Sequence, residues 1–133
     1  MGIVMEVMDK QGTDTLPKPG AFDRAMTADG RVDTKVLARL LDLPMTTIAP
    51  ALGLTRRALD INPTAPKAQP NARRLLTAMN ELALNLTDKR YALFWLKTPY
   101  TAFGGQTAAD WLKEGDLNGV CTHINRLVRR QPD

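Results

Sequence analysis

Apolar residues recur along this chain at the three- and four-residue spacing of helices, and no stretch alternates in the manner of a strand. One such segment runs from an N-capping Asp33 to about Asp42, and a longer one runs from an N-capping Asn71 to about Leu86. The last follows a capping Asp116. Their apolar stripes are Val36, Leu37, Leu40 and Leu41; Ala72, Leu75, Met79, Leu82, Ala83 and Leu86; and Leu117, Val120, Cys121, Ile124, Leu127 and Val128. The sequence therefore predicts an all-α fold.

Residues 91–112 hold nearly all the aromatic side chains, namely both tryptophans, both tyrosines and two of the three phenylalanines. Residues 91–96, capped by Thr87 with Asp88, are apolar on all sides at helical spacing, which predicts a buried helix. A Thr-Pro pair should end this helix, because proline disfavours helical geometry in the residue before it. A Gly-Gly pair then permits a sharp loop, and Thr107 caps a second helix. We expect this unit to form a core or a binding surface.

Residues 45–61 predict two short helices joined by a sharp turn. Thr46 or Thr47 caps the first helix, Gly53 makes the turn, and Thr55 caps the second helix. The small Ala49 lets the two helices approach closely, so the spacing matches a helix-turn-helix. Any pair of short helices joined by glycine gives the same pattern, and that alternative stays open.

In a helix-turn-helix that binds DNA, the start of the second helix enters the major groove. The residues predicted to contact DNA are therefore Thr55, Arg56 and Arg57. The alternative is a solvated helix start. Arginines near a helix N-terminus gain nothing from its dipole, which favours an external anion as their partner.

The positions of glycine and proline residues divide the chain into four regions. Residues 1–30 show no persistent apolar period and are expected to be poorly ordered or peripheral, apart from a short packing segment at Met5, Val7 and Met8. Residues 31–62 contain the helix-turn-helix-like region. Residues 63–70 are a proline-rich connector, and residues 71–133 are a helical domain.

The composition of the chain indicates its type of partner and its cellular location. The chain has 133 residues, 44% of them hydrophobic, and a formal net charge of +4, which leans mildly towards an anionic partner. No apolar run is long enough to cross a bilayer, and the first residues lack the pattern of a secretory signal. The single cysteine fits a reducing compartment, so a cytoplasmic location is expected.

Residues with catalytic chemistry are sparse. His123 is the only histidine, so no multi-histidine metal site exists, and no phosphate-binding glycine motif is present. Cys121 lies on an apolar stripe and is expected to be a small buried hydrophobe. It cannot face His123, because helix positions two apart point in different directions. We therefore expect no enzyme activity, no metal and no cofactor.

One combination of residues in the C-terminal half is specific as a set. It consists of Trp95, Leu96, Thr98, Pro99, Phe103, Gly104, Gly105, Thr107, Asp110, Trp111, Leu112 and Gly115. With this set, residues 71–128 resemble the toxin-binding domain of the Xre/MbcA/ParS antitoxin family, in which a helix-turn-helix region precedes this domain. Two positions depart from the family pattern: Ala108 stands where proline is usual, and Tyr100 where a small polar residue is common.

The resemblance implies an antitoxin that blocks a RES-domain, NAD-consuming toxin by direct binding and represses its own operon. Its partners would be that toxin and operator DNA, in a homodimer or a toxin–antitoxin hetero-oligomer. The alternative is a stand-alone helix-turn-helix transcription regulator without a toxin partner. The residues expected to reach the toxin are Tyr100, Phe103, Gly104, Gly105, Arg126, Arg129 and Arg130. For the arginines, a solvated cationic helix end is the competing interpretation.

Overall fold

The computed structural model describes residues 20–129, and this part of the chain is all-α, as predicted. Its α-helices are α2 (Thr34–Leu41), α3 (Met45–Leu52), α4 (Arg56–Ile61), α5 (Gln69–Asn85), α6 (Lys89–Leu96), α7 (Ala108–Lys113) and α8 (Leu117–Arg129). Three 3-10 turns are η1 (Asp23–Ala25), η2 (Pro66–Ala68) and η3 (Thr101–Phe103). Within residues 20–129 the only β-type pairing is an isolated bridge between Met26 and Val32.

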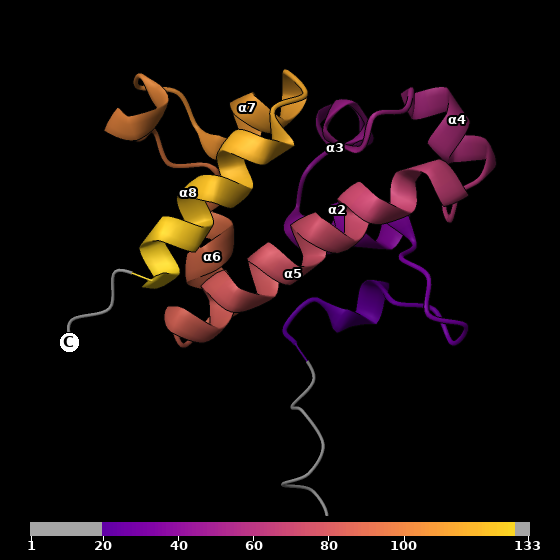
Figure 1. Ribbon diagram of the computed structural model, residues 1–133, viewed down its shortest axis with the longest axis horizontal. Coiled ribbons are helices and arrows are strands. Elements are labelled where there is room, and N and C mark those ends of the chain that lie inside the picture. Colours follow the sequence, from indigo (N-terminus) through magenta and orange to yellow (C-terminus); the bar gives the residue numbers. More distant parts are fainter. Residues whose placement is uncertain (1–19, 130–133) are drawn as a thin grey trace, which may run out of the picture.

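Helix α5 is the central element, and it crosses the whole molecule in Figure 1. Helices α6, α8 and α3 all pack against it. The apolar side predicted from its sequence is confirmed, because Leu75 and Met79 are completely buried and Leu82 nearly so. Burying each such side chain contributes about 1.5–3 kcal/mol. This helix therefore holds the other elements in place.

Five of the helix N-caps predicted from the sequence are confirmed. The side chain of Asp33 accepts hydrogen bonds from two backbone amides of α2, and Thr55 accepts one from Ala58 at 3.0 Å. Asp88 accepts a hydrogen bond from the backbone of Arg90 at 2.8 Å. Thr107, with Asp110, forms a complete capping box at the start of α7, and Asp116 accepts a hydrogen bond from the Gly119 amide. Each cap satisfies an amide that has no acceptor within its own helix.

Helix α3 begins earlier than predicted. It starts at Met45 after Pro44, so neither Thr46 nor Thr47 is the N-cap, and Thr47 is buried instead. Pro50 therefore lies inside the helix. The predicted turn at Gly53 is confirmed by its φ of +81°, a conformation that residues with a Cβ rarely adopt.

Helix α5 also begins earlier than predicted, at Gln69 in place of Asn71. Pro70 lies in the first turn, where its missing N–H would have had no acceptor in the helix. The side chain of Asn71 turns towards α3 and donates to the carbonyl of Ala51 at 3.4 Å. The segment before it is not a loose linker, since Ala65 and Ala68 are buried.

The sequence predicted residues 1–30 to be peripheral, and the part that the structure describes is not. Phe22 and Ala25 are buried in the core. The side chain of Asn80 on α5 accepts a hydrogen bond from the Phe22 amide at 2.8 Å and donates one to Asp23 at 2.8 Å. A single aromatic residue between glycines produces no periodicity, so the pattern could not reveal this contact. The predicted packing segment at residues 5–8 lies outside the described residues.

Candidate functional site

Five rings from four separate elements meet in one aromatic cluster. Phe103 of η3 lies at its centre, with ring centroids 4.3 Å from Trp111 of α7 and 5.0 Å from His123 of α8. His123 stacks on Trp95 of α6 at 6.0 Å and meets the edge of Tyr100 at 4.8 Å. Such pairs contribute about 0.5–1.5 kcal/mol beyond their burial. The cluster fixes the positions of α6, α7 and α8 relative to one another.

The loop between α6 and α7 is closed by its own hydrogen bonds. The amide of Tyr100 donates to the Gln106 carbonyl, and the amide of Gly105 donates to the Tyr100 carbonyl, both at 3.0 Å. The φ angles of Gly104 and Gly105 are +65° and +86°, which explains the need for glycine at both positions. The indole N–H of Trp111 donates to the Gln106 side chain at 3.1 Å. These hydrogen bonds hold the loop in one conformation and so position the aromatic rings.

Helix α6 is not buried on all sides, which corrects the prediction. Only Ala92 and Leu96 lie in the core, while Tyr91 is 60% exposed and Phe94 is 71% exposed. Neighbouring elements cover one side of α6, so the other side keeps its apolar residues in solvent. Leu84, just before this helix, is 76% exposed. The sequence contained the residues of this surface but could not show which side of α6 would be covered.

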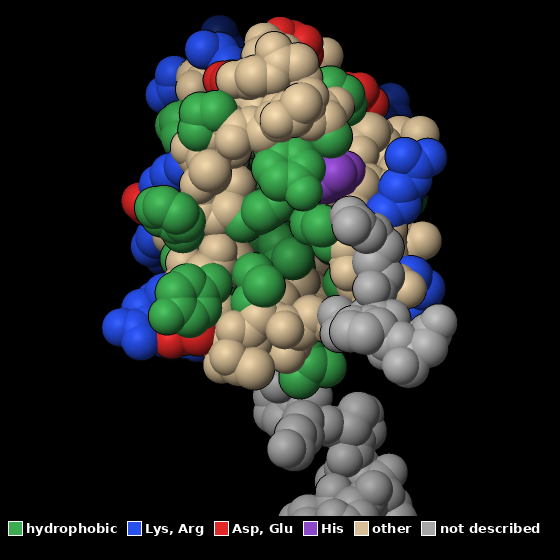
Figure 2. Space-filling model, turned by 90° about the vertical axis from the view of Figure 1, so that its left-hand side faces the viewer, with side chains coloured by type: hydrophobic (Ala, Val, Ile, Leu, Met, Phe, Trp, Pro, Cys, Tyr) green, Lys and Arg blue, Asp and Glu red, His purple; other side chains and the backbone are tan. Residues whose placement is uncertain are grey.

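The exposed side of α6 continues across to α8. Tyr91, Phe94 and Trp95 have the i, i+3, i+4 spacing that places them on one side of a helix. Trp95 contacts His123, and Leu127 lies four residues after His123 on the same side of α8. We call the surface formed by Tyr91, Phe94, Trp95, Tyr100, His123 and Leu127 the α6–α8 face. Figure 2 shows hydrophobic side chains gathered over this part of the molecule, with lysine and arginine side chains and several acidic ones along its edges.

Two hollows open on or beside the α6–α8 face. One, of about 440 Å³, is lined by Arg90, Tyr91 and Phe94. The other, of about 320 Å³, is formed by the α6–α7 loop and is lined by Pro99, Tyr100, Thr101, Gly104 and Gly105. Exposed apolar rings next to hollows of this size are typical of surfaces that bind other proteins.

Both basic and acidic side chains adjoin this face, and the acids lie outside α6 and α8. Neither α6 nor α8 contains an aspartate or a glutamate. Arg90 forms a bidentate pair with the N-cap Asp88, and this guanidinium lowers the pKa of the Asp88 carboxyl. Lys97, just after α6, pairs with Asp42 at 2.5 Å. For Lys89, no ion pair occurs among residues 20–129.

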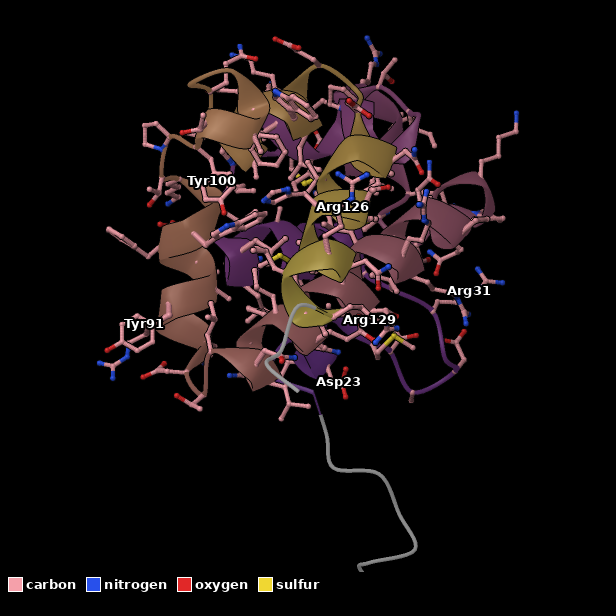
Figure 3. All side chains as sticks on the ribbon, turned by 60° about the vertical axis from the view of Figure 1, so that its left-hand side comes forward. Asp23, Arg31, Tyr91, Tyr100, Arg126 and Arg129 are labelled. Atoms are coloured by element: carbon pink, nitrogen blue, oxygen red, sulfur yellow. The ribbon has the colours of Figure 1, made fainter. Side chains whose placement is uncertain are left out.

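The predicted toxin-binding residues fall into three groups. Phe103 is 3% exposed, so it supports the face from below and is not available for contact. Tyr100 is half-buried on the face, and Gly104 and Gly105 line the adjoining hollow. Arg126 and Arg129 are exposed on α8, and Figure 3 shows them along this helix, with Tyr91 and Tyr100 on the α6 side. Arg130 lies outside the described residues.

The predicted DNA-contacting residues lie together at the start of α4. The Thr55 hydroxyl is occupied as the helix cap. Arg56 forms an exposed pair with Asp60 at 3.4 Å, and Arg57 is exposed. Figure 1 places α4 and α6 at opposite ends of the molecule. The structure therefore separates the two predicted binding regions.

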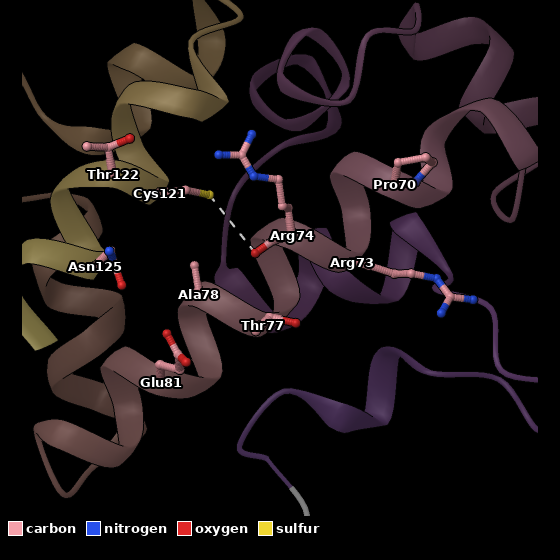
Figure 4. Close-up of a pocket in the computed structure, with 9 residues that line it drawn as sticks. All are labelled: Pro70, Arg73, Arg74, Thr77, Ala78, Glu81, Cys121, Thr122 and Asn125. Carbon is pink, nitrogen blue, oxygen red and sulfur yellow. Dashed lines mark hydrogen bonds between the residues drawn. The ribbon is translucent and has the colours of Figure 1, made fainter. Parts of the chain in front are cut away.

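A third region, the groove between α5 and α8, has a volume of about 480 Å³. Arg73 and Arg74 line it, and Figure 4 shows their side chains pointing in different directions. Arg73 donates to the Gly30 carbonyl at 2.7 Å and Arg74 donates to Asn118 at 2.8 Å. Burial raises the pKa of the Cys121 thiol in its wall, which disfavours the reactive thiolate. This groove therefore lacks a convergent set of groups that could hold an anion or act as a nucleophile.

Residues 20–129 offer neither a cluster of metal ligands nor a membrane span. Among the described residues, no group of three or more His, Cys, Asp or Glu side chains could hold a metal ion. No helix in residues 20–129 has the length and apolarity required to cross a membrane. Comparisons with protein-family models, curated proteins and solved structures found no match.

Proposed function

We propose that this protein is the antitoxin of a type II toxin–antitoxin module, and that it neutralises a RES-domain toxin by docking through the α6–α8 face. The observation that supports this proposal best is the exposure of Tyr91 and Phe94. An aromatic side chain buries 150–250 Å², so covering the exposed parts of these two would contribute on the order of 5 kcal/mol before the costs of association. Burying these rings against a protein partner is therefore favourable compared with leaving them exposed to solvent.

The sequence resemblance supplies the kind of partner, and the shape of the surface agrees with inhibition by occlusion. The closed α6–α7 loop stands beside the face and presents a hollow built from backbone and small side chains. No residues in this region form a catalytic constellation, so a role in binding is the simpler explanation.

Co-expression with the protein encoded by the adjacent gene tests the proposal. We expect the neighbour to arrest growth when expressed alone and to become harmless when this chain is present. The double variant Tyr91→Ser and Phe94→Ser should lose neutralisation while keeping the helical circular dichroism spectrum. Ile61→Ser is the matched control, because Ile61 is 76% exposed on α4, away from the face. A neighbour that is harmless alone, or lethal in the presence of this chain, would refute the proposal.

We further propose that the α3–α4 unit is a helix-turn-helix that represses the operon. The supporting observation is the exposure of Arg56 and Arg57 at the start of α4. A gel shift on the upstream DNA tests this role: Arg57→Ala should weaken binding and flatten its salt dependence through loss of a phosphate contact. Retained DNA repression together with absent neutralisation would favour the alternative, a stand-alone transcription regulator.

A further inference from the structure

We infer that the α6–α8 face is built for an acidic, amphipathic segment of the partner, which lays an apolar stripe on the exposed rings and directs carboxylates to the cationic edges. This inference rests on the proposed function, since it concerns the same surface, and it adds the chemistry of what is bound. Two observations carry it: the arrangement of rings and hollows, and the absence of acids from both helices.

The apolar part of the face has the layout of a helix-binding surface. Tyr91 and Phe94 lie one helical turn apart, and one of the two hollows is beside them. The other hollow lies on the adjoining α6–α7 loop and is lined in part by Tyr100. Helices that dock on such surfaces anchor themselves through side chains spaced i, i+3, i+4 and i+7. The exposed fractions of Tyr91 and Phe94, 60% and 71%, leave most of both rings available to such anchors.

The edges of the face select for acids. Lys89 and Arg90 mark the α6 edge, and Arg126 marks the α8 edge, three residues after His123 on the same side of the helix. Asp88 pairs with Arg90 at the α6 edge, so a basic segment would meet repulsion mainly from Lys89 and Arg126. Charges at the rim of an interface mainly determine specificity and association rate. The Arg90 side chain also lines the hollow beside Phe94, where its guanidinium is already paired with Asp88.

The same features argue against nucleic acid as the occupant. Surfaces that bind single strands run a cationic groove along the phosphate backbone and place aromatic rings within it for stacking. Here the cations stand at the edges, and the centre is formed by Trp95, His123 and Leu127. An apolar centre with cationic edges is the complement of an amphipathic protein segment with acidic flanks.

The test uses two synthetic peptides of 18 residues, labelled with fluorescein and blocked at both ends. Both carry the same stripe of leucine and phenylalanine; one has glutamate at every flanking position and the other has lysine. Fluorescence anisotropy with the full chain at 50 mM NaCl should give at least ten-fold tighter binding of the glutamate peptide. Raising the salt to 500 mM should weaken that binding several-fold, because salt screens exposed charges.

Variants locate the binding. Phe94→Ser and Arg126→Glu should each weaken the glutamate peptide at least five-fold, with unchanged circular dichroism. The controls Ile61→Ser and Arg31→Glu change other exposed residues away from the face and should alter binding less than two-fold. Absent binding, equal affinity for the two peptides, or equal effects of the controls would overturn the inference.

Two further arms separate the alternatives. Displacement of the peptide by oligothymidylate would assign the face to nucleic acid, and Phe94-dependent sedimentation with phosphatidylserine vesicles would assign it to membranes; either result overturns the inference. The peptide assay needs no toxin. A face that prefers the glutamate peptide in a chain that fails to neutralise its neighbour would support the inference and refute the proposed function.

Discussion

Replacement by alanine should strongly destabilise the protein at Phe103 and hardly change its stability at Phe94. Phe103 is 3% exposed and packs against four other rings, the nearest with its centroid 4.3 Å away. Phe94 is 71% exposed. Replacing a buried phenylalanine with alanine removes its transfer free energy and leaves a cavity, at a cost of about 3–5 kcal/mol. This range includes the loss of the ring contacts, so we expect about 4 kcal/mol for Phe103→Ala. Phe94→Ala should change the free energy of unfolding by less than about 0.5 kcal/mol.

Urea unfolding followed by circular dichroism at 222 nm measures both values. Phe103→Ala should lower the midpoint at an unchanged m-value, and should lower the melting temperature by on the order of 10 °C or more. Phe94→Ala should leave both unchanged while weakening partner binding. Phe103→Leu serves as a control, since a conservative apolar replacement should recover most of the stability. If Phe94→Ala destabilised the protein as much as Phe103→Ala, the assignment of one ring to the support and the other to the exposed face would be wrong.

Three further predictions concern stability and reactivity. Thr107→Ala removes half of the capping box and should destabilise the protein by about 1 kcal/mol in urea unfolding, whereas Thr107→Ser should be nearly neutral. Gly115→Ala places a side chain at a φ of +86° and should cost about 1–2 kcal/mol; a higher melting temperature would contradict this. Cys121 should react with iodoacetamide at pH 8.5 more slowly in the native protein than in 8 M urea, because burial raises its pKa. Since this pKa is raised, Cys121's contribution to stability should be complete below the ordinary thiol range and decline at higher pH, a decline that Cys121→Ser should lack.

The features predicted correctly from the sequence are those that short segments determine. Asp33, Thr55 and Thr107 cap their helices because each cap involves residues at most three positions away. Gly53 ends α3 because its backbone conformation excludes most other residues. These features depend little on tertiary contacts, so the pattern of residue types is sufficient to place them.

The exposed side of α6 could not be predicted in the same way. All of residues 91–96 are apolar, and such a run is equally compatible with complete burial and with an unpartnered face. Only the packing of α6 against its neighbours decides which rings are covered. Likewise, Asn80 reads as an ordinary polar position, although it ties the Phe22 segment to α5 through two hydrogen bonds. Contacts between segments 58 residues apart leave no periodic signal.

The packing of α7 against α3 has a consequence for how proteins of this architecture can diversify. Leu112 of α7 and Ile48 of α3 belong to one continuous core, so the regions before and after residue 70 share buried apolar contacts. A recombination event that exchanged the C-terminal half would expose α3 unless the incoming half brought a matching helix. On the proposed function, new specificities should therefore arise by substitution on the outer sides of α6 and α8, and seldom by exchange of whole halves.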